Sequence, residues 1–421
     1  MIFVPAFAAE YTAIQSGNWS DLSTWGETSA IPGMDGAGDV VKIASGVDLV
    51  LDTELDYSIS KIQWESGGGE KRNLTITAGG KLTTTDESQL WYKTNLDINV
   101  INGGEFNMAN LAWDADGDIN VKDGGKFYGK FTQMKGTEAG KTLLVENATA
   151  GATGEWKLEP TDANTSVTIH VKGATGLLDM NYSGEQSLYM YAANNAAAIV
   201  KVTDGGKISG NGTFGINYWD ELRQDATNRA LIHGAGSQIA MNSVFIGNRS
   251  DQARTGTGKN ILELGGLDDE GNFAAAGPES IVADWNFYIY KDAELRINFG
   301  NENAGEANGP LIKFGRVDSQ ITVSGPGLLT LDFTNVDLSE GEYVFNLISS
   351  TRNAFALENL YSDLNVLLNS NQSFDKDSDL VFDGNNLSVI LHVSQIPEPA
   401  SAALLLGLAG LALAASKRRR N

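Results

Sequence analysis

The feature that most constrains the fold of this chain is a short element that recurs along it. Each copy has an apolar-x-apolar run, one or two further residues, a Gly-Gly pair, a polar residue and another apolar residue. The four copies end in Ala78-Gly-Gly-Lys-Leu82, Asn102-Gly-Gly-Glu-Phe106, Asp123-Gly-Gly-Lys-Phe127 and Asp204-Gly-Gly-Lys-Ile208. Glycine adopts positive φ without steric cost, so these pairs suit sharp corners. Gly80, Gly104 and Gly125 lie 24 and 21 residues apart, about one rung of a parallel β-solenoid.

The rest of the region from residue 11 to 391 consists of short apolar-alternating runs, and hardly any segment keeps a helical period over three turns. The runs most typical of strands are Leu74–Thr77, Ile98–Ile101, Ile119–Lys122, Ser166–Val171, Ala198–Val202, Phe287–Tyr290 and Gln320–Val323. We therefore expect an all-β chain that forms a right-handed parallel β-helix, whose stacked rungs share one apolar interior. A sandwich of antiparallel hairpins is the alternative, because Gly-Gly is also a hairpin signal.

Both ends of this region have the pattern of closing segments. The stretch Gly17–Trp25 resembles the opening of many exported bacterial β-solenoids, and we expect Trp19 and Trp25 to form a cap core rather than a sugar-stacking surface. The runs in Gly341–Ser350 and Asp379–Leu391 resemble the closing strands of autotransporter-passenger-like solenoids. We divide the chain into a remnant of a signal peptide (1–10), an N-terminal cap with the first rungs (11–66), the solenoid (67–340), closing strands (341–394) and a C-terminal tail (395–421).

The tail combines three features in a fixed order. The motif Pro397-Glu398-Pro399 comes first and is followed by sixteen uncharged residues, 400–415. A helix of that length covers about 24 Å, slightly less than the roughly 30 Å of a bilayer core. The tail ends in a basic cluster made of Lys417, Arg418, Arg419 and Arg420. By the positive-inside rule we expect this cluster to stay in the cytoplasm and everything before Pro397 to lie outside it.

Together these features resemble the PEP-CTERM sorting signal of Gram-negative bacteria, over about the last 25 residues. The resemblance implies that an exosortase-type protease recognises Pro397-Glu398-Pro399 and cleaves near it, so that the single transmembrane helix holds the protein in the inner membrane only transiently. A permanent tail anchor is the alternative. The start of the chain also has the small residues Ala6, Ala8 and Ala9 in an A-x-A-like arrangement, as at the end of a signal peptide.

The composition excludes several function classes. The chain has no cysteine, so disulfides, thiolate metal sites and a cysteine nucleophile cannot be proposed. It has 53 acidic against 30 basic residues, and without the four basic residues of the tail the balance is about −27. A body this acidic repels phosphate backbones, so we expect no nucleic-acid partner.

Several clusters are candidates for ligand binding, and the strongest consists of Trp219, Asp220, Glu221 and Arg223. Two further carboxylate groups are Asp114, Asp116 and Asp118 beside Trp113, and Asp268, Asp269 and Glu270. Each could hold a general acid and base or a calcium ion, but aspartates of this kind more often serve as solvated turn residues. The segment Asp375–Asp379 has the first carboxylate spacings of a calcium loop but has Leu380 where that loop needs glycine. His170, His233 and His392 are far apart in sequence, so we assign no metal ligand, no catalytic residue and no cofactor.

We therefore expect a non-enzymatic structural or adhesive protein of the cell surface or extracellular matrix, associated with extracellular polysaccharide. Two alternatives remain open. The first is a β-helix polysaccharide lyase or glycoside hydrolase, which requires a carboxylate or basic cluster on one exposed sheet face. The second is a module that binds carbohydrate or Ca²⁺ without turnover.

Overall fold

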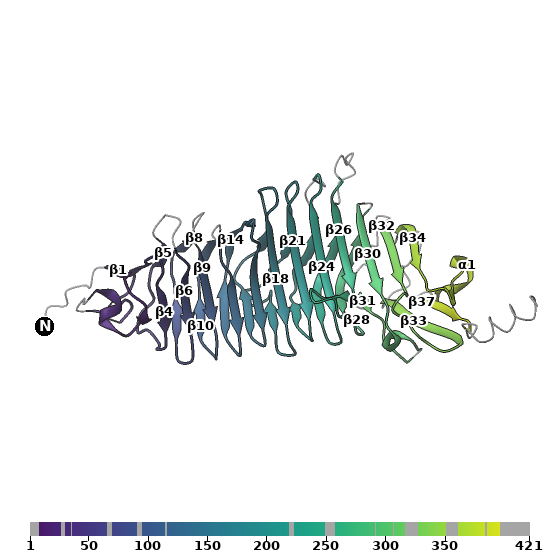
Figure 1. The fold of residues 1–421 in the computed structure, drawn as a ribbon, viewed down its shortest axis with the longest axis horizontal. Coiled ribbons are helices and arrows are strands. Elements are labelled where there is room, and N and C mark those ends of the chain that lie inside the picture. Colours follow the sequence, from purple (N-terminus) through teal and green to yellow (C-terminus); the bar gives the residue numbers. More distant parts are fainter. Residues whose placement is uncertain are drawn as a thin grey trace, which may run out of the picture.

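The computed structural model describes residues 8–26, 30–34, 36–64, 70–90, 95–113, 116–218, 223–248, 257–290, 292–305, 307–315, 327–350, 361–383 and 385–395. These residues form an elongated body in which strands stack from the N-terminal to the C-terminal end (Figure 1). Nearly all regular structure in them is β, and the long sheets are parallel, as a β-solenoid requires. The predicted all-β parallel fold is therefore confirmed. Parallel pairing on both sides of the Gly-Gly turns shows that the antiparallel sandwich was the wrong alternative.

One sheet of thirteen parallel strands runs the length of the described body. Its strands, in order, are β2 (Gly17–Asn18), β4 (Asp48–Leu51), β6 (Arg72–Ile76), β9 (Leu96–Val100), β12 (Ile119–Lys122), β15 (Lys141–Glu146), β18 (Ser166–Lys172), β21 (Ala197–Thr203), β24 (Thr227–His233), β26 (Lys259–Leu264), β30 (Ala293–Asn298), β32 (Gly327–Asp332) and β34 (Tyr361–Leu367). Alternate residues of these strands are buried, as in β18, because one side of the sheet faces the core. The other side is available for polar residues.

A nineteen-stranded sheet contains the remaining walls of the solenoid. It includes β7 (Lys81–Thr83), β8 (Glu87–Leu90), β10 (Glu105–Asn107), β11 (Asn110–Trp113), β13 (Lys126–Gly129), β14 (Phe131–Met134), β16 (Thr149–Ala152), β17 (Trp156–Leu158), β19 (Leu177–Asp179), β20 (Leu188–Met190), β22 (Lys207–Ser209), β23 (Thr213–Ile216), β25 (Gln238–Ile246), β29 (Ile281–Ile289), β31 (Ile312–Phe314), β33 (Gly341–Ser350), β35 (Gln372–Ser373), β36 (Leu380–Phe382) and β37 (Asn386–Val393). Each early rung contributes two short strands to this sheet, one for each of two walls. The strand β25 pairs with both β22 and β23, so one continuous strand forms both walls in that rung.

The Gly-Gly corners explain why the sequence element repeats. The first glycine has positive φ, as in Gly124 at 78°. The second glycine lies against the previous rung: a Cβ on Gly125 would stand 2.1 Å from the carbonyl oxygen of Val100. Each position therefore needs glycine for a different reason, and the next apolar residue, Phe127, returns to the core with no exposed surface.

The rungs are not of constant length, and later rungs exceed the 24 and 21 residues that separate the first Gly-Gly copies. Ile98 lies opposite Ile119, whereas further along Leu262 lies opposite Leu295. The additional residues lengthen both the strands and the connections between them, while the strands remain paired in parallel. One such connection holds a two-stranded antiparallel hairpin, β27 (Gly266–Leu267) and β28 (Phe273–Ala274).

Each end of the body is closed differently. At the N-terminal end β1 (Glu10–Ala13), β3 (Val40–Ile43) and β5 (Lys61–Trp64) form a separate parallel sheet beside the 3₁₀ turn η1 (Leu22–Trp25). Trp19 has no exposed surface, and its Nε1 donates to the Pro32 carbonyl at 3.0 Å. Trp25 packs edge-on against it and is 3% exposed, so the two rings are core residues of the cap and not a sugar platform.

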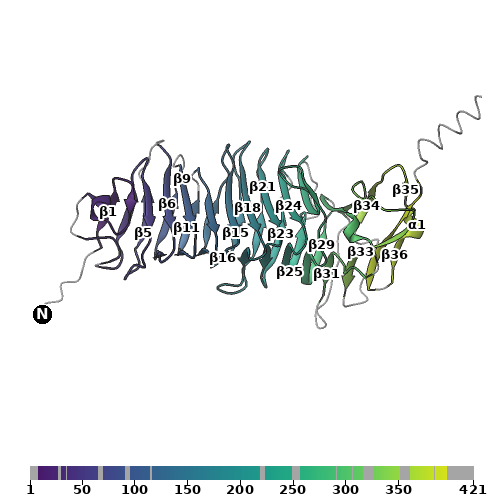
Figure 2. The same cartoon turned by 60° about the horizontal axis from the view of Figure 1, so that its bottom comes forward.

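At the C-terminal end the pairing becomes antiparallel. The strand β37 runs antiparallel to β33, β35 and β36, and the short helix α1 (Lys376–Asp379) lies beside it. Figure 1 labels β37, and Figure 2 shows β33, β35, β36 and α1 at the same end of the body. An antiparallel strand cannot continue the parallel stacking, so it terminates the solenoid. A second 3₁₀ turn, η2 (Asn301–Asn303), follows β30.

Within the described ranges, no helix has the length and apolar character needed to cross a bilayer. The predicted transmembrane segment 400–415 lies outside these ranges, as do the sorting motif and the strand predicted at 320–323.

Candidate functional site

The strongest ligand cluster predicted from the sequence is only partly described. Trp219, Asp220 and Glu221 lie outside the described residues, and Arg223 is exposed just before β24. This cluster stays a prediction. The sorting residues Pro397, Glu398 and Pro399 and the basic cluster Lys417, Arg418, Arg419 and Arg420 also lie outside the described part.

Of the predicted carboxylates at 114–118, Asp118 forms hydrogen bonds to neighbouring rungs. Asp118 Oδ1 accepts a hydrogen bond from the Thr142 amide at 2.8 Å, and the Asp118 amide donates to Asp97 Oδ1 at 3.1 Å. These bonds link the beginnings of β9, β12 and β15 in neighbouring rungs. Asp114 lies outside the described residues, and Trp113 is fully buried.

The carboxylates at 375–379, whose spacing resembles the start of a calcium loop, belong instead to the short helix α1 and its N-terminal cap. Asp375 caps α1 by accepting from the Asp377 amide at 3.0 Å. Asp379 accepts from the Asp375 amide at 2.7 Å and contacts His392 Nε2 at 3.0 Å. Within the described ranges, His, Asp and Glu side chains form no group of three or more suited to a metal ion.

The third acidic group, Asp268 to Glu270, forms the tip of the β27–β28 hairpin. The Asp268 amide donates to the Asn272 carbonyl, and the Asn272 amide returns a bond to Asp268 Oδ1 at 2.7 Å. Asn272 Nδ2 also donates to Asp268 Oδ2 at 3.0 Å, and these bonds lower the Asp268 pKa. The tip is therefore held in one shape by its own hydrogen bonds.

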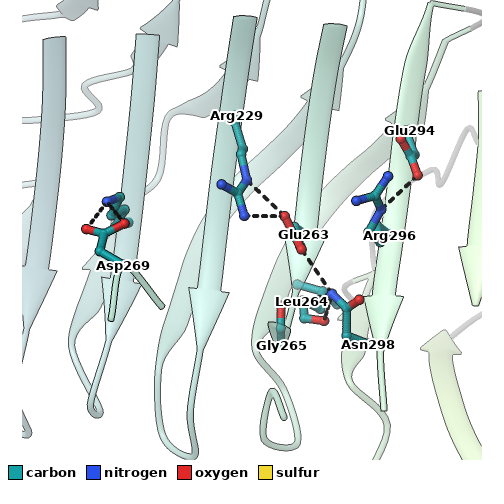
Figure 3. Close-up of polar contacts among 9 residues, drawn as sticks. Arg229, Glu263, Leu264, Gly265, Asp269, Glu294, Arg296 and Asn298 are labelled. Atoms are coloured by element: carbon teal, nitrogen blue, oxygen red, sulfur yellow. Dashed lines mark hydrogen bonds and ion pairs between the residues drawn. The ribbon is translucent and has the colours of Figure 1, made fainter. Parts of the chain in front are cut away.

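An ion pair fastens the hairpin to the outer face of the thirteen-stranded sheet. Lys201 Nζ on β21 donates to Asp269 Oδ1 at 2.7 Å, across 68 residues of sequence (Figure 3). The Lys201 side chain is only 16% exposed, whereas Asp269 is 73% exposed. The hydrogen bond from Lys201 lowers the Asp269 pKa. Asp268 and Asp269 are therefore both ionised at neutral pH, which does not suit the proton donor of a glycosidase.

Between the hairpin and the sheet lies a cleft that encloses about 70 Å³. Its floor consists of two outward columns that run across β18, β21 and β24. In one column His170 pairs in register with Lys201 and Lys201 with Leu231; in the other the members are Lys172, Thr203 and His233. Asp204, Asp268, Asp269 and Glu270 complete the lining. We call this site the hairpin cleft.

The two histidines of the hairpin cleft have defined environments. His170 Nε2 lies 2.9 Å from Thr203 Oγ1, and burial together with the adjacent Lys201 and Lys172 lowers the His170 pKa. The imidazole of His170 is therefore neutral at pH 7. His233 is 6% exposed, and its Nε2 lies 3.3 Å from the Asn272 carbonyl, whereas its enclosed Nδ1 has no hydrogen-bond partner. Sequence reasoning missed that both histidines line one cleft, because stacking, not sequence proximity, places His170 and His233 on the same sheet face.

A second polar group continues along the same sheet face beyond the cleft. Glu263 Oε2 accepts from Arg229 Nε at 2.9 Å, and its Oε1 accepts from Asn298 Nδ2 at 3.1 Å (Figure 3). On the next strand Glu294 Oε1 accepts from Arg296 Nε at 3.0 Å. Both carboxylates already have strong donors, so this group stabilises the stacking of β24, β26 and β30.

The fold defines a parallel β-solenoid body, and comparison with known families identifies the segment that follows it. Residues 395–420 match the PEP-CTERM protein-sorting motif. The chain is therefore an exported protein with a PEP-CTERM signal, which implies processing by an exosortase and a location at the cell surface or outside the cell. This confirms the family resemblance of the tail. No curated protein and no solved structure matches the chain.

Proposed function

We propose that this protein is a non-enzymatic structural or adhesive component of the cell surface or extracellular matrix. The observation that carries the proposal is the order of its parts: a long β-solenoid followed directly by a sorting signal. A solenoid offers an extended rigid surface, and its closed ends prevent uncontrolled edge-to-edge growth. The right-handed winding expected for parallel β-crossovers belongs to the same proposal.

We further propose that residues 400–415 span the inner membrane as a helix until the exosortase cuts the chain. Only three residues separate the end of β37 at Val393 from Pro397. An extended chain spans at most about 3.5 Å per residue, so Pro397 lies within about 14 Å of the folded body. The C-terminal end of the solenoid must then face the membrane during processing, and the N-terminal cap points away from it.

The role of the carboxylates supports a non-enzymatic function over polysaccharide cleavage. Asp268, Asp269 and Glu263 are bound by Asn272, Lys201 and Arg229 respectively. The bonds to Asp268 and Asp269 lower the pKa values of these two carboxyls, whereas a glycosidase needs one carboxyl that keeps its proton near neutral pH. Release of reducing ends from extracellular polysaccharides by the purified protein, lost on Asp269→Asn substitution, would favour the enzymatic alternative.

The sorting proposal is tested by expressing the full chain in a host with an exosortase. The parent is compared with a triple variant, Pro397→Ala, Glu398→Ala and Pro399→Ala, and with Ser394→Ala as a control just outside the motif. Mass spectrometry of membrane and medium fractions should show a shortened C-terminus for the parent and for Ser394→Ala, and an intact one for the triple variant. Intact chains in the membrane for all three proteins would instead identify a permanently anchored surface protein.

A further inference from the structure

We propose that Tyr128 and Tyr182 form an oxidative cross-linking site, at which a peroxide couples the two rings through a carbon–carbon bond. The resulting dityrosine joins two parts of the chain that lie 54 positions apart in sequence. This inference goes beyond the proposed function, because it concerns a covalent modification of the solenoid body that does not depend on how the tail is processed.

The two rings lie face to face on the outside of the solenoid. Tyr128 belongs to β13, and Tyr182 lies in the exposed turn between β19 and β20. Their ring centroids are 3.9 Å apart, and the ring planes differ by 14°. The Tyr182 side chain is 47% exposed, so an oxidant in solution reaches this ring directly.

Gly151 provides the space in which the rings meet. In the stacked strands it lies opposite Tyr128 on β13 and opposite Asp179 on β19. A Cβ on Gly151 would stand 2.6 Å from Tyr128 Cδ1 and 2.9 Å from the Cβ of Tyr182. Gly151 does not have positive φ, so the ring pair and not the backbone conformation requires glycine here.

Hydrogen bonds hold the turn that carries Tyr182 against the neighbouring rungs. Ser183 Oγ donates to the Ala152 carbonyl on β16 at 3.3 Å. On the other side, the Asn211 amide between β22 and β23 donates to Asn181 Oδ1 at 2.9 Å. The two phenols are therefore positioned before any reaction, which favours their coupling over coupling between separate molecules.

The coupling balances with one molecule of hydrogen peroxide. A peroxidase uses the peroxide to remove one electron and one proton from each phenol, and the peroxide is reduced to two molecules of water. The two phenoxyl radicals join through ring carbons next to the hydroxyls, and the hydrogens on those carbons move to the oxygens, which restores both aromatic phenols. Burial raises the pKa of Tyr128, so this residue enters the reaction as a neutral phenol.

Such a cross-link provides what a disulfide provides in other exported proteins. This chain has no cysteine, so it cannot form a disulfide in the oxidising surroundings outside the cell. A bond between Tyr128 and Tyr182 ties β13 to the turn after β19 and restricts the unfolded chain. Other tyrosine pairs are less suited: Tyr189 and Tyr191 have centroids 5.8 Å apart, and each is only 8% exposed.

The purified full chain is treated with a haem peroxidase and limiting hydrogen peroxide at several protein concentrations. N-acetyltyrosine in a parallel reaction shows that the oxidant is active. The parent should develop dityrosine fluorescence, lose the mass of two hydrogen atoms and yield, after proteolysis, a peptide pair joined at Tyr128 and Tyr182. The fraction linked should not depend on protein concentration, because the bond forms within one chain, and the linked protein should have a higher urea midpoint.

Variants locate the cross-link. Tyr128→Phe and Tyr182→Phe each keep a ring in the stack and remove a phenol, so both should fold and lose this peptide pair. Tyr57→Phe changes another tyrosine that is 48% exposed and should retain the pair. The proposal is overturned if N-acetyltyrosine couples while the parent does not, if the links join separate chains or other tyrosines instead, if the Tyr128 and Tyr182 variants form dityrosine as the parent does, or if linking leaves the urea midpoint unchanged.

Discussion

Two of the three histidines have surroundings that shift their pKa values in opposite directions. The hydrogen bond from His392 Nε2 to Asp379 Oδ1 raises the His392 pKa above 6.5, and Glu342 near its Nδ1 adds to the effect. His170 is desolvated and lies beside two lysines, which lowers its pKa below 6.5. The C-terminal cap therefore favours the cationic form of its histidine, whereas the hairpin cleft favours the neutral form.

We expect these shifts to give the folded protein two opposite pH dependences. The stabilisation from His392 is present below pH 6.5 and is lost as the pH rises through its raised pKa. For His170 the unfolded chain binds the proton more readily, so its effect is a loss of stability as the pH falls below 6.5. Histidine NMR titration should place the His392 midpoint above 6.5 and that of His170 below it.

Two substitutions separate these effects. Asp379→Asn should move the His392 midpoint back toward 6.5 and leave His170 unchanged, whereas Lys201→Ala should raise the His170 midpoint alone. A His392 midpoint lower than that of His170 in the parent protein would show that these environments are not as described.

At the scale of single elements, a buried carboxylate links β24, β26 and β30. Glu263 is 6% exposed, and both of its oxygens are bound, one by Arg229 and the other by Asn298. Glu263→Ala leaves both donors without this partner and should lower the free energy of unfolding by about 2 kcal/mol. Glu263→Gln keeps the shape of the side chain and should cost less.

The matched control for this prediction is an exposed ion pair of similar length. Lys157 Nζ and Glu155 Oε1 lie 2.8 Å apart, with both side chains more than two fifths exposed. Glu155→Ala should therefore change stability by only about 0.5 kcal/mol. Urea denaturation measures both variants, and equal losses for Glu263→Ala and Glu155→Ala would refute a structural role for the buried network.

The same elements show what the sequence could and could not predict. The Gly-Gly corners were predictable because two local constraints, positive φ at Gly124 and close approach at Gly125, both require glycine. The strands at Ile119–Lys122 and Ser166–Lys172 follow from alternation alone. Rung length was not predictable from the early copies, because longer connections alter the repeat without altering the stacking.

The hairpin cleft was not predictable for a related reason. Asp268, Asp269 and Glu270 were candidates, but turn acids of this kind are usually solvated, and the pattern does not show that Asp269 reaches Lys201. That contact depends on the register of three rungs and on the hairpin folding back over the sheet. His170 and His233 reach the lining of the same cleft through the same register, which is a property of the stacked structure and not of any local motif.

At the scale of the whole molecule, each rung contacts mainly the rungs on either side of it, so the body behaves as a nearly one-dimensional array. Correct folding then depends more on the register between neighbouring strands than on the number of rungs. Leu143 of β15 lies opposite Ile169 of β18, and both are fully buried. Deleting residues 143–168 should place Ile169 where Leu143 was, opposite Ile119, and should preserve the alternation of buried and outward residues.

We therefore expect the 143–168 deletion to fold, with a smaller urea m-value because one rung less of surface is exposed on unfolding. Deleting residues 143–167 provides the control. This variant retains Thr168, and the extra residue shifts the alternation, so that Thr168 turns inward and Ile169 turns outward. That protein should lose cooperative unfolding or aggregate, as followed by circular dichroism and size-exclusion chromatography. Equal behaviour of the two deletions would mean that the connections absorb a one-residue shift and that in-register stacking does not determine the fold.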